Sequence, residues 1–327
     1  MGVAHAARSQ AALAQRQLLR AVRGRGEVSM LGAELIVDGH PMRYGVSNND
    51  EGAEQIWAIN IHGFFCAGPM YHRESEHLAE SLGWRVVNPS LPGFGGSDPL
   101  AWGELSLASM ARRIEALMDH LGIERALLLG HSMGAATAIE FATAHPERVL
   151  GIIYRDGAAT PAWHHRHGIL PRLFSPIAPD IGAMADLGLS VAADLPDLLA
   201  GRILSTLRSV LPDLRRNLKT LGRTAPVASM LMETDLTTEV EVLATAGIPF
   251  LAEWGCFDRI TTPETAEEFA NAAGVSVLWV PGGHSWMLAR PTGQADLLRL
   301  LPLGRQFLDA VGVRALRGAG RPHLRAV

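Results

Sequence analysis

A single serine lies between two glycines where an apolar run of the sequence ends. The stretch 127–146 reads LLLGHSMGAATAIEFATAHP, and Ser132 stands at the centre of its GHSMG motif. An apolar strand, Gly-X-Ser-X-Gly and a helix, in that order, predict a nucleophile elbow, a sharp turn that holds the serine hydroxyl above the sheet. The structural alternative is that Gly130 ends the strand, Gly134 packs the helix closely and Ser132 caps the helix.

A nucleophilic serine needs a base to remove its proton and a carboxylate to orient that base. The segment FLAEWGCFDRITTPETAEEF supplies Asp258 just after an apolar strand pattern, and VLWVPGGHSWMLARP supplies His284 just after the last such pattern. We therefore expect Ser132 as nucleophile, Asp258 as orienting acid and His284 as general base. Asp156, in IIYRDGAA at the end of another strand pattern, is the alternative acid.

Attack on a carbonyl also requires backbone donors for the oxyanion that forms. One expected donor is the amide of Met133, the residue after the nucleophile. The second is the amide of Phe64, in the segment IWAINIHGFFCAGPM, because Gly63 lets that loop turn. The side chains expected to contact substrate are His131, Phe65, Trp286 and Met230. For His131 the alternative is support of the elbow.

These residues require a scaffold that brings distant loops together. Strand patterns occupy residues 34–37, 42–46, 56–61, 85–88, 126–129, 150–154, 249–254 and 275–280. Helical patterns occupy residues 71–82, 106–121, 133–144, 265–271 and 294–311. This alternation predicts an α/β fold, a mainly parallel sheet with helices on both faces. Open parallel sheets bind ligands at the carboxyl ends of their strands, which is where the candidate residues fall.

The alternation stops after residue 156, in a long stretch rich in Leu, Ala, Pro and Met. It is too long for an ordinary loop, so we expect a helical cap. The predicted organisation is an N-terminal arm (1–27), the first part of the core (28–156), the cap (157–239), the second part of the core (240–312) and a C-terminal tail (313–327).

Composition narrows the class of protein. The chain has 327 residues, of which 48% are hydrophobic and 19% charged, with 29 basic and 33 acidic residues and a net charge of −4. Without a basic stripe or a long apolar stretch, we expect a cytoplasmic protein with no nucleic-acid partner and no membrane span. The expected partner is a small-molecule substrate, and the oligomeric state is open between monomer and homodimer.

No cofactor or metal is expected. Three histidines, His164, His165 and His167, crowd the start of the predicted cap, but no acidic residue or cysteine accompanies them as a further ligand. Cys66 and Cys256 are too few and too far apart for a disulfide framework, so both are expected to be buried free thiols.

Taken together, the segments resemble the α/β-hydrolase family with an inserted helical cap, over about residues 34–311. The resemblance rests on HGF for the oxyanion loop, NPSLPGFGGSDP for the loop after the next strand, GHSMG for the elbow, GCFDRITTP for the acid and PGGHSWMLARP for the histidine. It implies eight strands, with the second antiparallel and the cap after the sixth. Ser90 stands where the family commonly has aspartate, at a position that is structural in the family.

The resemblance also narrows the chemistry. Serine at the elbow argues against the haloalkane dehalogenase and epoxide hydrolase branches, which need a carboxylate nucleophile. His131 resembles esterases and lipases more than carbon-carbon hydrolases, which often have asparagine there. We expect a serine esterase (a carboxylesterase) that acts on a small to medium, largely apolar substrate. Thioester, lactone, carbon-carbon, acyl-transfer and perhydrolase chemistry are alternatives for the same triad, and a low-turnover ligand-binding protein is another.

Overall fold

An eight-stranded sheet forms the centre of the molecule. The structure is a computed structural model that describes residues 28–49, 55–166, 211–213, 215–217, 227, 230–231 and 233–319. The strands are β1 (Met30–Val37), β2 (His40–Ser47), β3 (Trp57–Ile61), β4 (Arg85–Pro89), β5 (Ala126–His131), β6 (Val149–Arg155), β7 (Phe250–Gly255) and β8 (Val277–Val280). Their order is β1-β2-β4-β3-β5-β6-β7-β8, and β2 is antiparallel to both neighbours while β3 to β8 are parallel. The predicted α/β fold is confirmed.

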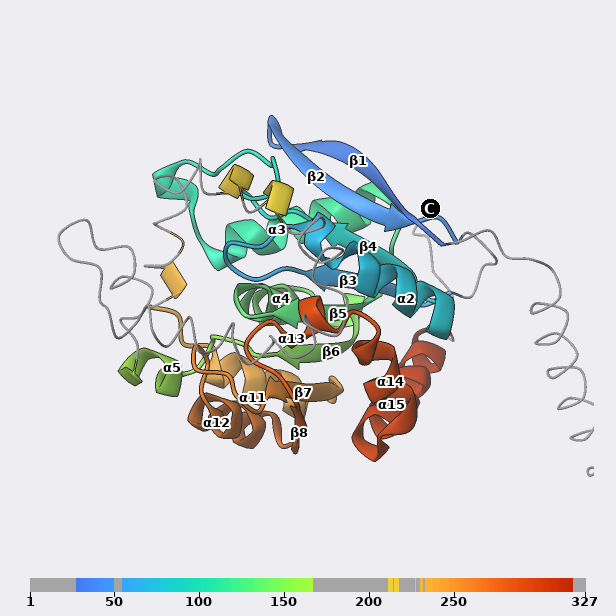
Figure 1. Cartoon of the computed structure of the whole chain (residues 1–327), viewed down its shortest axis with the longest axis vertical. Helices are drawn as coiled ribbons and strands as arrows, with labels where there is room; N and C mark the ends of the chain where they lie inside the picture. Colours follow the sequence, from blue (N-terminus) through green and yellow to red (C-terminus); the bar gives the residue numbers. More distant parts are fainter. Residues whose placement is uncertain are drawn as a thin grey trace, which may run out of the picture.

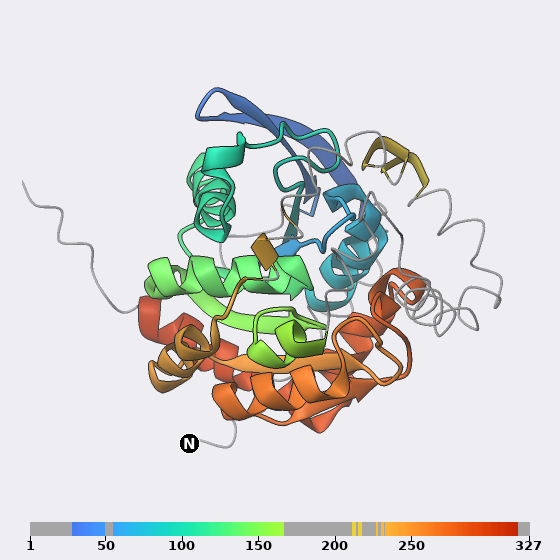
Figure 2. The same cartoon turned by 90° about the vertical axis from the view of Figure 1, so that its left-hand side faces the viewer.

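Helices cover both faces of this sheet (Figure 1). One face carries α2 (His72–Leu82), α14 (Gly293–Leu300) and α15 (Pro302–Ala319). The other carries α3 (Leu107–His120), α4 (Met133–Ala144), α11 (Thr237–Thr245) and α12 (Pro263–Ala273), and Figure 2 is viewed from this side. The short helices α5 (Pro161–Arg166) and α13 (Trp286–Ala289) lie in the connections.

The two central strands owe their continuous apolar runs to burial on both faces. Every residue of β5 and β6 is buried. Because side chains alternate along a strand, Leu128 packs into the core under α3 and α4, whereas Leu127 and Leu129 pack into the core under α2, α14 and α15. The strand that leads into the elbow is therefore packed on both faces of the sheet.

The predicted single helix over 294–311 is wrong, because the chain forms two helices there. Leu301 is extended (φ −90°, ψ 145°) between α14 and α15, and Pro302 begins α15. Proline disfavours helical geometry in the residue before it and is well tolerated at the first helical position. α15 then continues past residue 312, where the core was expected to end, to Ala319.

The two cysteines differ in exposure. Cys66 is partly buried, and burial raises the pKa of its thiol to about 11. Cys256 is exposed, so the expectation of two buried thiols is wrong. It follows the last residue of β7, where the chain leaves the sheet at its rim.

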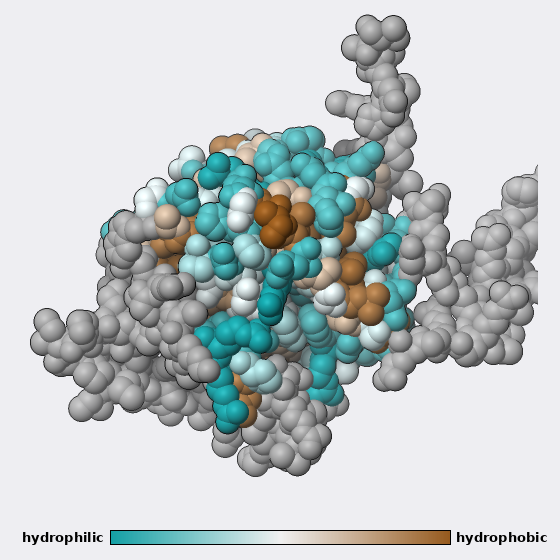
Figure 3. All heavy atoms as spheres, turned by 90° about the horizontal axis from the view of Figure 1, so that it is seen from above, coloured by the Kyte–Doolittle hydropathy of each residue, from teal (hydrophilic) through white to brown (hydrophobic). Residues whose placement is uncertain are grey.

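The face seen in Figure 3, on the side of the β1–β2 hairpin, is mostly hydrophilic with small separate hydrophobic patches. Leu31 and Ile36 of β1 are among the exposed apolar side chains of the chain. Within the described ranges, no helix is long and apolar enough to cross a membrane. The predicted arm (1–27), much of the predicted cap and the side chains of His164, His165 and His167 lie outside the described residues.

Candidate active site

Ser132 lies in a sharp turn between β5 and α4. Its backbone has φ 52° and ψ −115°, a strained conformation that residues other than glycine rarely adopt. Its amide donates to the carbonyl of Arg155 at 3.0 Å, which continues the pairing of β5 with β6. The side chain accepts no capping hydrogen bond from α4, so the structural alternative of a helix-capping serine does not describe this residue.

Both glycines of the GHSMG motif lie so close to neighbouring backbone atoms that there is no room for a Cβ atom. A Cβ atom at Gly134 would lie 2.2 Å from the carbonyl oxygen of Ile61, and one at Gly130 would lie 2.5 Å from Cα of Ala135. Such separations are too short for any side chain. The elbow is thus held tightly between β3 and the first turn of α4.

The loop after β3 lies directly against the elbow. A Cβ atom at Gly63 would lie 3.2 Å from Cβ of Ser132. His62 fixes this loop because its Nδ1 donates to the Gly63 carbonyl at 2.8 Å while its Nε2 accepts from the Leu91 amide at 2.9 Å. Burial lowers the pKa of His62 to about 4, so the ring is neutral and can serve both partners. The loop that carries Phe64 therefore has a fixed position beside the serine.

The two expected oxyanion donors belong to the two segments that meet here: Met133 follows Ser132 in the elbow, and Phe64 follows Gly63 in the loop after β3. Met133 is the first residue of α4, where a helix amide has no acceptor within its own helix. The ring of Phe64 packs edge-to-face against the rings of Phe65 and Phe94, at centroid distances of 4.7 and 5.7 Å. The loop is therefore aromatic on this side.

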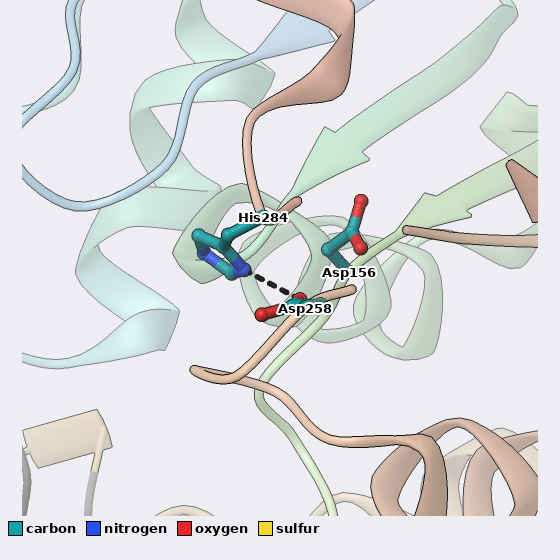
Figure 4. Close-up of side chains that lie close together, drawn as sticks. All are labelled: Asp156, Asp258 and His284. Atoms are coloured by element: carbon teal, nitrogen blue, oxygen red, sulfur yellow. Dashed lines mark hydrogen bonds and ion pairs between the residues drawn. The ribbon is translucent and has the colours of Figure 1, made fainter. Parts of the chain in front are cut away.

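Asp258 and His284 are in hydrogen-bond contact (Figure 4). Nδ1 of His284 lies 2.8 Å from Oδ2 of Asp258, and the Asp258 side chain is fully buried. Its Oδ1 accepts from the amides of Ile260 and Thr261 at 2.7 and 3.1 Å, and Thr261 Oγ1 donates to Oδ2 at 2.6 Å. A carboxylate with this many donors is held in one orientation, as an orienting acid must be.

Asp156, the alternative acid, lies beside this pair and accepts N–H hydrogen bonds from two other residues. Its Oδ1 accepts from the Gly255 amide at 2.8 Å and its Oδ2 accepts from Nε1 of Trp286 at 2.9 Å. Trp286, expected at the substrate, is only 1% exposed and belongs to a buried cluster. Its indole N–H donates to Asp156. Of the two candidate acids, Asp258 is the one whose carboxyl group is hydrogen-bonded to His284.

His131, the neighbour of the serine, is hydrogen-bonded at both ring nitrogens. Its Nε2 lies 2.7 Å from the backbone carbonyl of His284, and its Nδ1 lies 2.6 Å from the Tyr71 hydroxyl. A carbonyl can only accept, so Nε2 carries the proton and Nδ1 accepts from Tyr71. Burial, and then the nearby His284, hold the pKa of His131 well below its usual value, which keeps the ring neutral. His131 therefore supports the loops, and the expectation that it contacts substrate is not what the structure shows.

One residue of the predicted cap reaches the loop after β3. Nδ2 of Asn217 donates to the carbonyls of Phe65 and Cys66 at 2.8 and 3.1 Å, and its Oδ1 accepts from the Gly95 amide at 3.1 Å. Phe65 has a positive φ of 62°, and this contact helps to hold that conformation. No local pattern in the sequence marks Asn217, because all its partners are distant in the chain.

Met230 lies in a different environment from the triad candidates. It lines a cavity of about 570 Å³ whose described walls are residues 105–108, Glu140 and residues 233–236. Ser132 and His284 are not among those described walls. A contact of Met230 with substrate is therefore not supported by the part of the site that the structure describes.

A buried polar network lies under the site. Arg155 donates to Glu74 and to Asn60 at 2.6 Å each, and Gln294 donates to Glu253 at 2.7 Å. These side chains come from β6, α2, β3, α14 and β7, so the network ties both halves of the core together. The sequence gives no local signal for it, since each partner lies far from the others along the chain.

Ser90, which departs from the common family residue, has a structural contact. Its Oγ accepts from the Gly68 amide at 3.2 Å, and its carbonyl accepts from Ser97 Oγ at 2.7 Å. It thus fastens the loop after β4 to the segment before α2.

Asp156, Asp258 and His284 also place potential metal-ligand atoms within 4.8 Å of one another. The N–H and O–H donors described above already point at the oxygens of both carboxyls. A cation here would face the positive ends of those dipoles, so the arrangement suits a hydrogen-bonded acid and base better than a metal centre.

The sheet order, the strained elbow and the acid–histidine pair define a hydrolase of the α/β class. The family model of the alpha/beta hydrolase fold matches residues 59–288, and the chain belongs to this family. The match spans the elbow, both acids and His284.

Similar proteins carry several activities in their names. A "Putative non-heme haloperoxidase" of Mycobacterium phage D29 is 31% identical over 290 residues, 88% of this chain and 99% of that protein. A "2-hydroxy-6-oxo-6-phenylhexa-2,4-dienoate hydrolase" of Comamonas testosteroni is 49% identical over 121 residues, 35% of this chain and 41% of that protein. The enol-lactonase of Burkholderia xenovorans LB400 superposes with a TM-score of 0.64 at 21% identity, over 85% of this chain and all of that chain, which shows the shared fold.

Proposed function

We propose that this chain is a serine hydrolase that cleaves a carboxylic ester of a small to medium, largely apolar substrate through an acyl-enzyme. Ser132 attacks the carbonyl carbon while His284 takes its proton, and His284 then returns that proton to the departing alkoxide. Water, activated by the same histidine, releases the acid. Asp258 orients His284, and the amides of Phe64 and Met133 hold the oxyanion.

The observation that carries this proposal is the conformation of Ser132. The residue is held at φ 52° by the surrounding packing, and α4 does not use its side chain as a cap. Strain of this kind persists where surrounding structure enforces it, and it is characteristic of catalytic positions. The Asp258–His284 pair on the same edge of the sheet supplies the matching base.

An apolar substrate is supported by the phenylalanine rings of the loop after β3. We further propose that residues 157–239 form a cap that completes the substrate site, which the contact of Asn217 with that loop supports.

Two alternatives use the same acyl-enzyme or the same triad. Perhydrolysis, in which hydrogen peroxide replaces water and releases a peracid, is favoured by the haloperoxidase-named relative, which covers most of this chain. Carbon-carbon bond hydrolysis is favoured by the 121-residue match to the dienoate hydrolase. Product identification, with esters in the presence and absence of peroxide and with a vinylogous 1,5-diketone, separates the three reactions.

The direct test is hydrolysis of short p-nitrophenyl esters by the wild type, by Ser132→Ala and by the exposed control Ser276→Ala. We expect Ser132→Ala to lose turnover and labelling by a fluorophosphonate probe, and Ser276→Ala to keep both. Retained turnover in Ser132→Ala would overturn the proposal. Labelling of Ser132 without turnover of any substrate would favour the ligand-binding alternative.

A further inference from the structure

One carboxyl group joins the two loops that carry the proposed acid and base. Asp156 follows β6, its side chain is fully buried, and it accepts hydrogen bonds from the Gly255 amide and from Nε1 of Trp286. Gly255 ends β7 and opens the loop that leads to Asp258. Trp286 begins α13, shortly after His284.

Both partners of this carboxyl are fixed in place. A Cβ atom at Gly255 would lie 2.3 Å from the Gly283 carbonyl oxygen, so the end of β7 packs directly on the histidine loop. Trp286 belongs to a buried apolar cluster with Met70, Tyr71, Val280 and Met287. Asp156 itself has a positive φ of 45°, a strained conformation that surrounding contacts must maintain. The bridge is therefore a rigid part of the site.

The surroundings of Asp156 favour its protonated form. Its two hydrogen-bond donors are neutral N–H groups, and the titratable groups that share its cluster are Asp258 and His284 (Figure 4). The adjacent guanidinium of Arg155 is bonded to Glu74 and Asn60. Burial, and then the negative charge of Asp258, raise the pKa of Asp156 well above its ordinary value.

We propose that Asp156 is a positioning residue that, as a neutral carboxylic acid, joins the loop of Asp258 to the loop of His284. A carboxylic acid suits this place because its two oxygens can accept both N–H groups while its O–H proton can face the Asp258 carboxylate. An amide has one accepting oxygen and can serve only one of the two donors. A neutral Asp156 also leaves Asp258 as the single negative charge that stabilises protonated His284.

The first test of this inference, which rests on the proposed function, compares esterase kinetics of three variants. Asp156→Asn keeps the size and one accepting oxygen, so we expect kcat to fall about tenfold, as for the loss of one buried hydrogen bond. Asp156→Leu should fall further, and the exposed control Asp309→Asn should match the wild type. Full kcat in Asp156→Leu, with a folded protein by circular dichroism, would overturn the proposal.

Trp286→Phe tests the same bridge from its other end, because it removes the indole N–H and keeps an aromatic ring. If Asp156 acts through Trp286, the fold-decrease in kcat of the double variant Asp156→Asn/Trp286→Phe should be smaller than the product of the fold-decreases of the two single variants. Strictly multiplicative losses would overturn the bridge. This comparison does not depend on Asp156→Leu being well folded.

The protonation state has two readouts of its own. The acid limb of kcat/KM should keep its position in Asp156→Asn, because a neutral group exerts no net charge on His284. An ionised Asp156 would instead stabilise protonated His284, and its removal would move the limb to lower pH by about one unit or more, which would overturn the inference.

Infrared spectroscopy with ¹³C-labelled aspartate gives the second readout and does not require activity. We expect a band of a protonated aspartic acid at neutral pH that disappears in Asp156→Asn and persists in Asp309→Asn. The same band in both variants would overturn the inference. If Ser132→Ala keeps turnover, the proposed function fails, whereas this spectrum still tests Asp156.

Discussion

The hydroxyl of Tyr71 lies 2.6 Å from Nδ1 of His131, and this contact links three loops of the candidate site. The Tyr71 hydroxyl also accepts from the Gly63 amide at 3.4 Å, and His131 reaches the His284 carbonyl with its other nitrogen. The loop after β3, the elbow and the histidine loop therefore share one chain of hydrogen bonds. We therefore expect substitutions at Tyr71 or His131 to change kcat.

The first prediction concerns this chain. Tyr71→Phe should lower kcat for ester hydrolysis by about tenfold, because Nδ1 of buried His131 loses its donor at a cost of about 1–2 kcal/mol. His131→Phe should lower kcat at least as much, since it also releases the His284 carbonyl. Steady-state kinetics of both variants and of the double variant measure the coupling. Independent effects of the two substitutions would show that the link has no catalytic role.

The second prediction concerns Asn217. Asn217→Ala removes two donors from the loop that carries Phe65, so we expect kcat/KM to fall about tenfold. Asn217→Asp should be at least as harmful, because a carboxylate would face the carbonyl oxygens of Phe65 and Cys66 with no proton to donate. Kinetics on a short p-nitrophenyl ester test both. Wild-type activity in Asn217→Asp would contradict the predicted role.

The third prediction compares a glycine that has no room for a Cβ atom, Gly134, with one whose Cβ position is open, Gly312. Gly134→Ala would place Cβ 2.2 Å from the Ile61 carbonyl oxygen, so the free energy of unfolding should fall by about 3 kcal/mol. Gly312, within α15, has nothing within 4 Å of its Cβ position, and Gly312→Ala should raise that free energy by about 0.5–1 kcal/mol. Urea unfolding of both variants provides the measurement. Equal stabilities would show that close approach at the elbow is not the constraint.

The fourth prediction concerns the buried acid Glu253. Burial raises its pKa from 4.5 to about 8, so the folded protein binds this proton more tightly than the unfolded chain. The stability that this tighter binding contributes is present below pH 4.5 and is lost as the pH rises towards 8.

Glu253→Gln removes that titration and keeps an oxygen for Gln294. Between pH 5 and 8 we expect the variant to lose less stability than the wild type, by about 1 kcal/mol per pH unit. Urea unfolding at several pH values, with the exposed Glu241→Gln as control, measures this difference. Parallel curves for the wild type and Glu253→Gln would contradict it.

The sequence was most informative where the chemistry needs particular residue types at strand ends. Ser132, Asp258 and His284 could be chosen because each follows an apolar run, and the structure brings Asp258 and His284 into contact. The strands were equally recognisable, since burial on both faces of β5 and β6 leaves long apolar runs.

The sequence was least informative where a side chain depends on a distant partner. His131 and Trp286 were expected at the substrate, yet Tyr71 and Asp156 occupy their polar atoms. Nothing local marks Tyr71 as a partner of His131. The break at Pro302 could have been predicted from the sequence, because proline disfavours helical geometry in the residue before it.

The order of synthesis follows from the positions of the strands that carry the site. Ser132 follows β5, whereas Asp258 and His284 follow β7 and β8, the last strands of the sheet to be made. A ribosome that adds roughly 5–20 residues per second makes Ser132 roughly 8–30 seconds before His284. During that interval the emerging chain carries the proposed nucleophile without its proposed base, so the proposed attack on a substrate carbonyl has no group to take the serine proton.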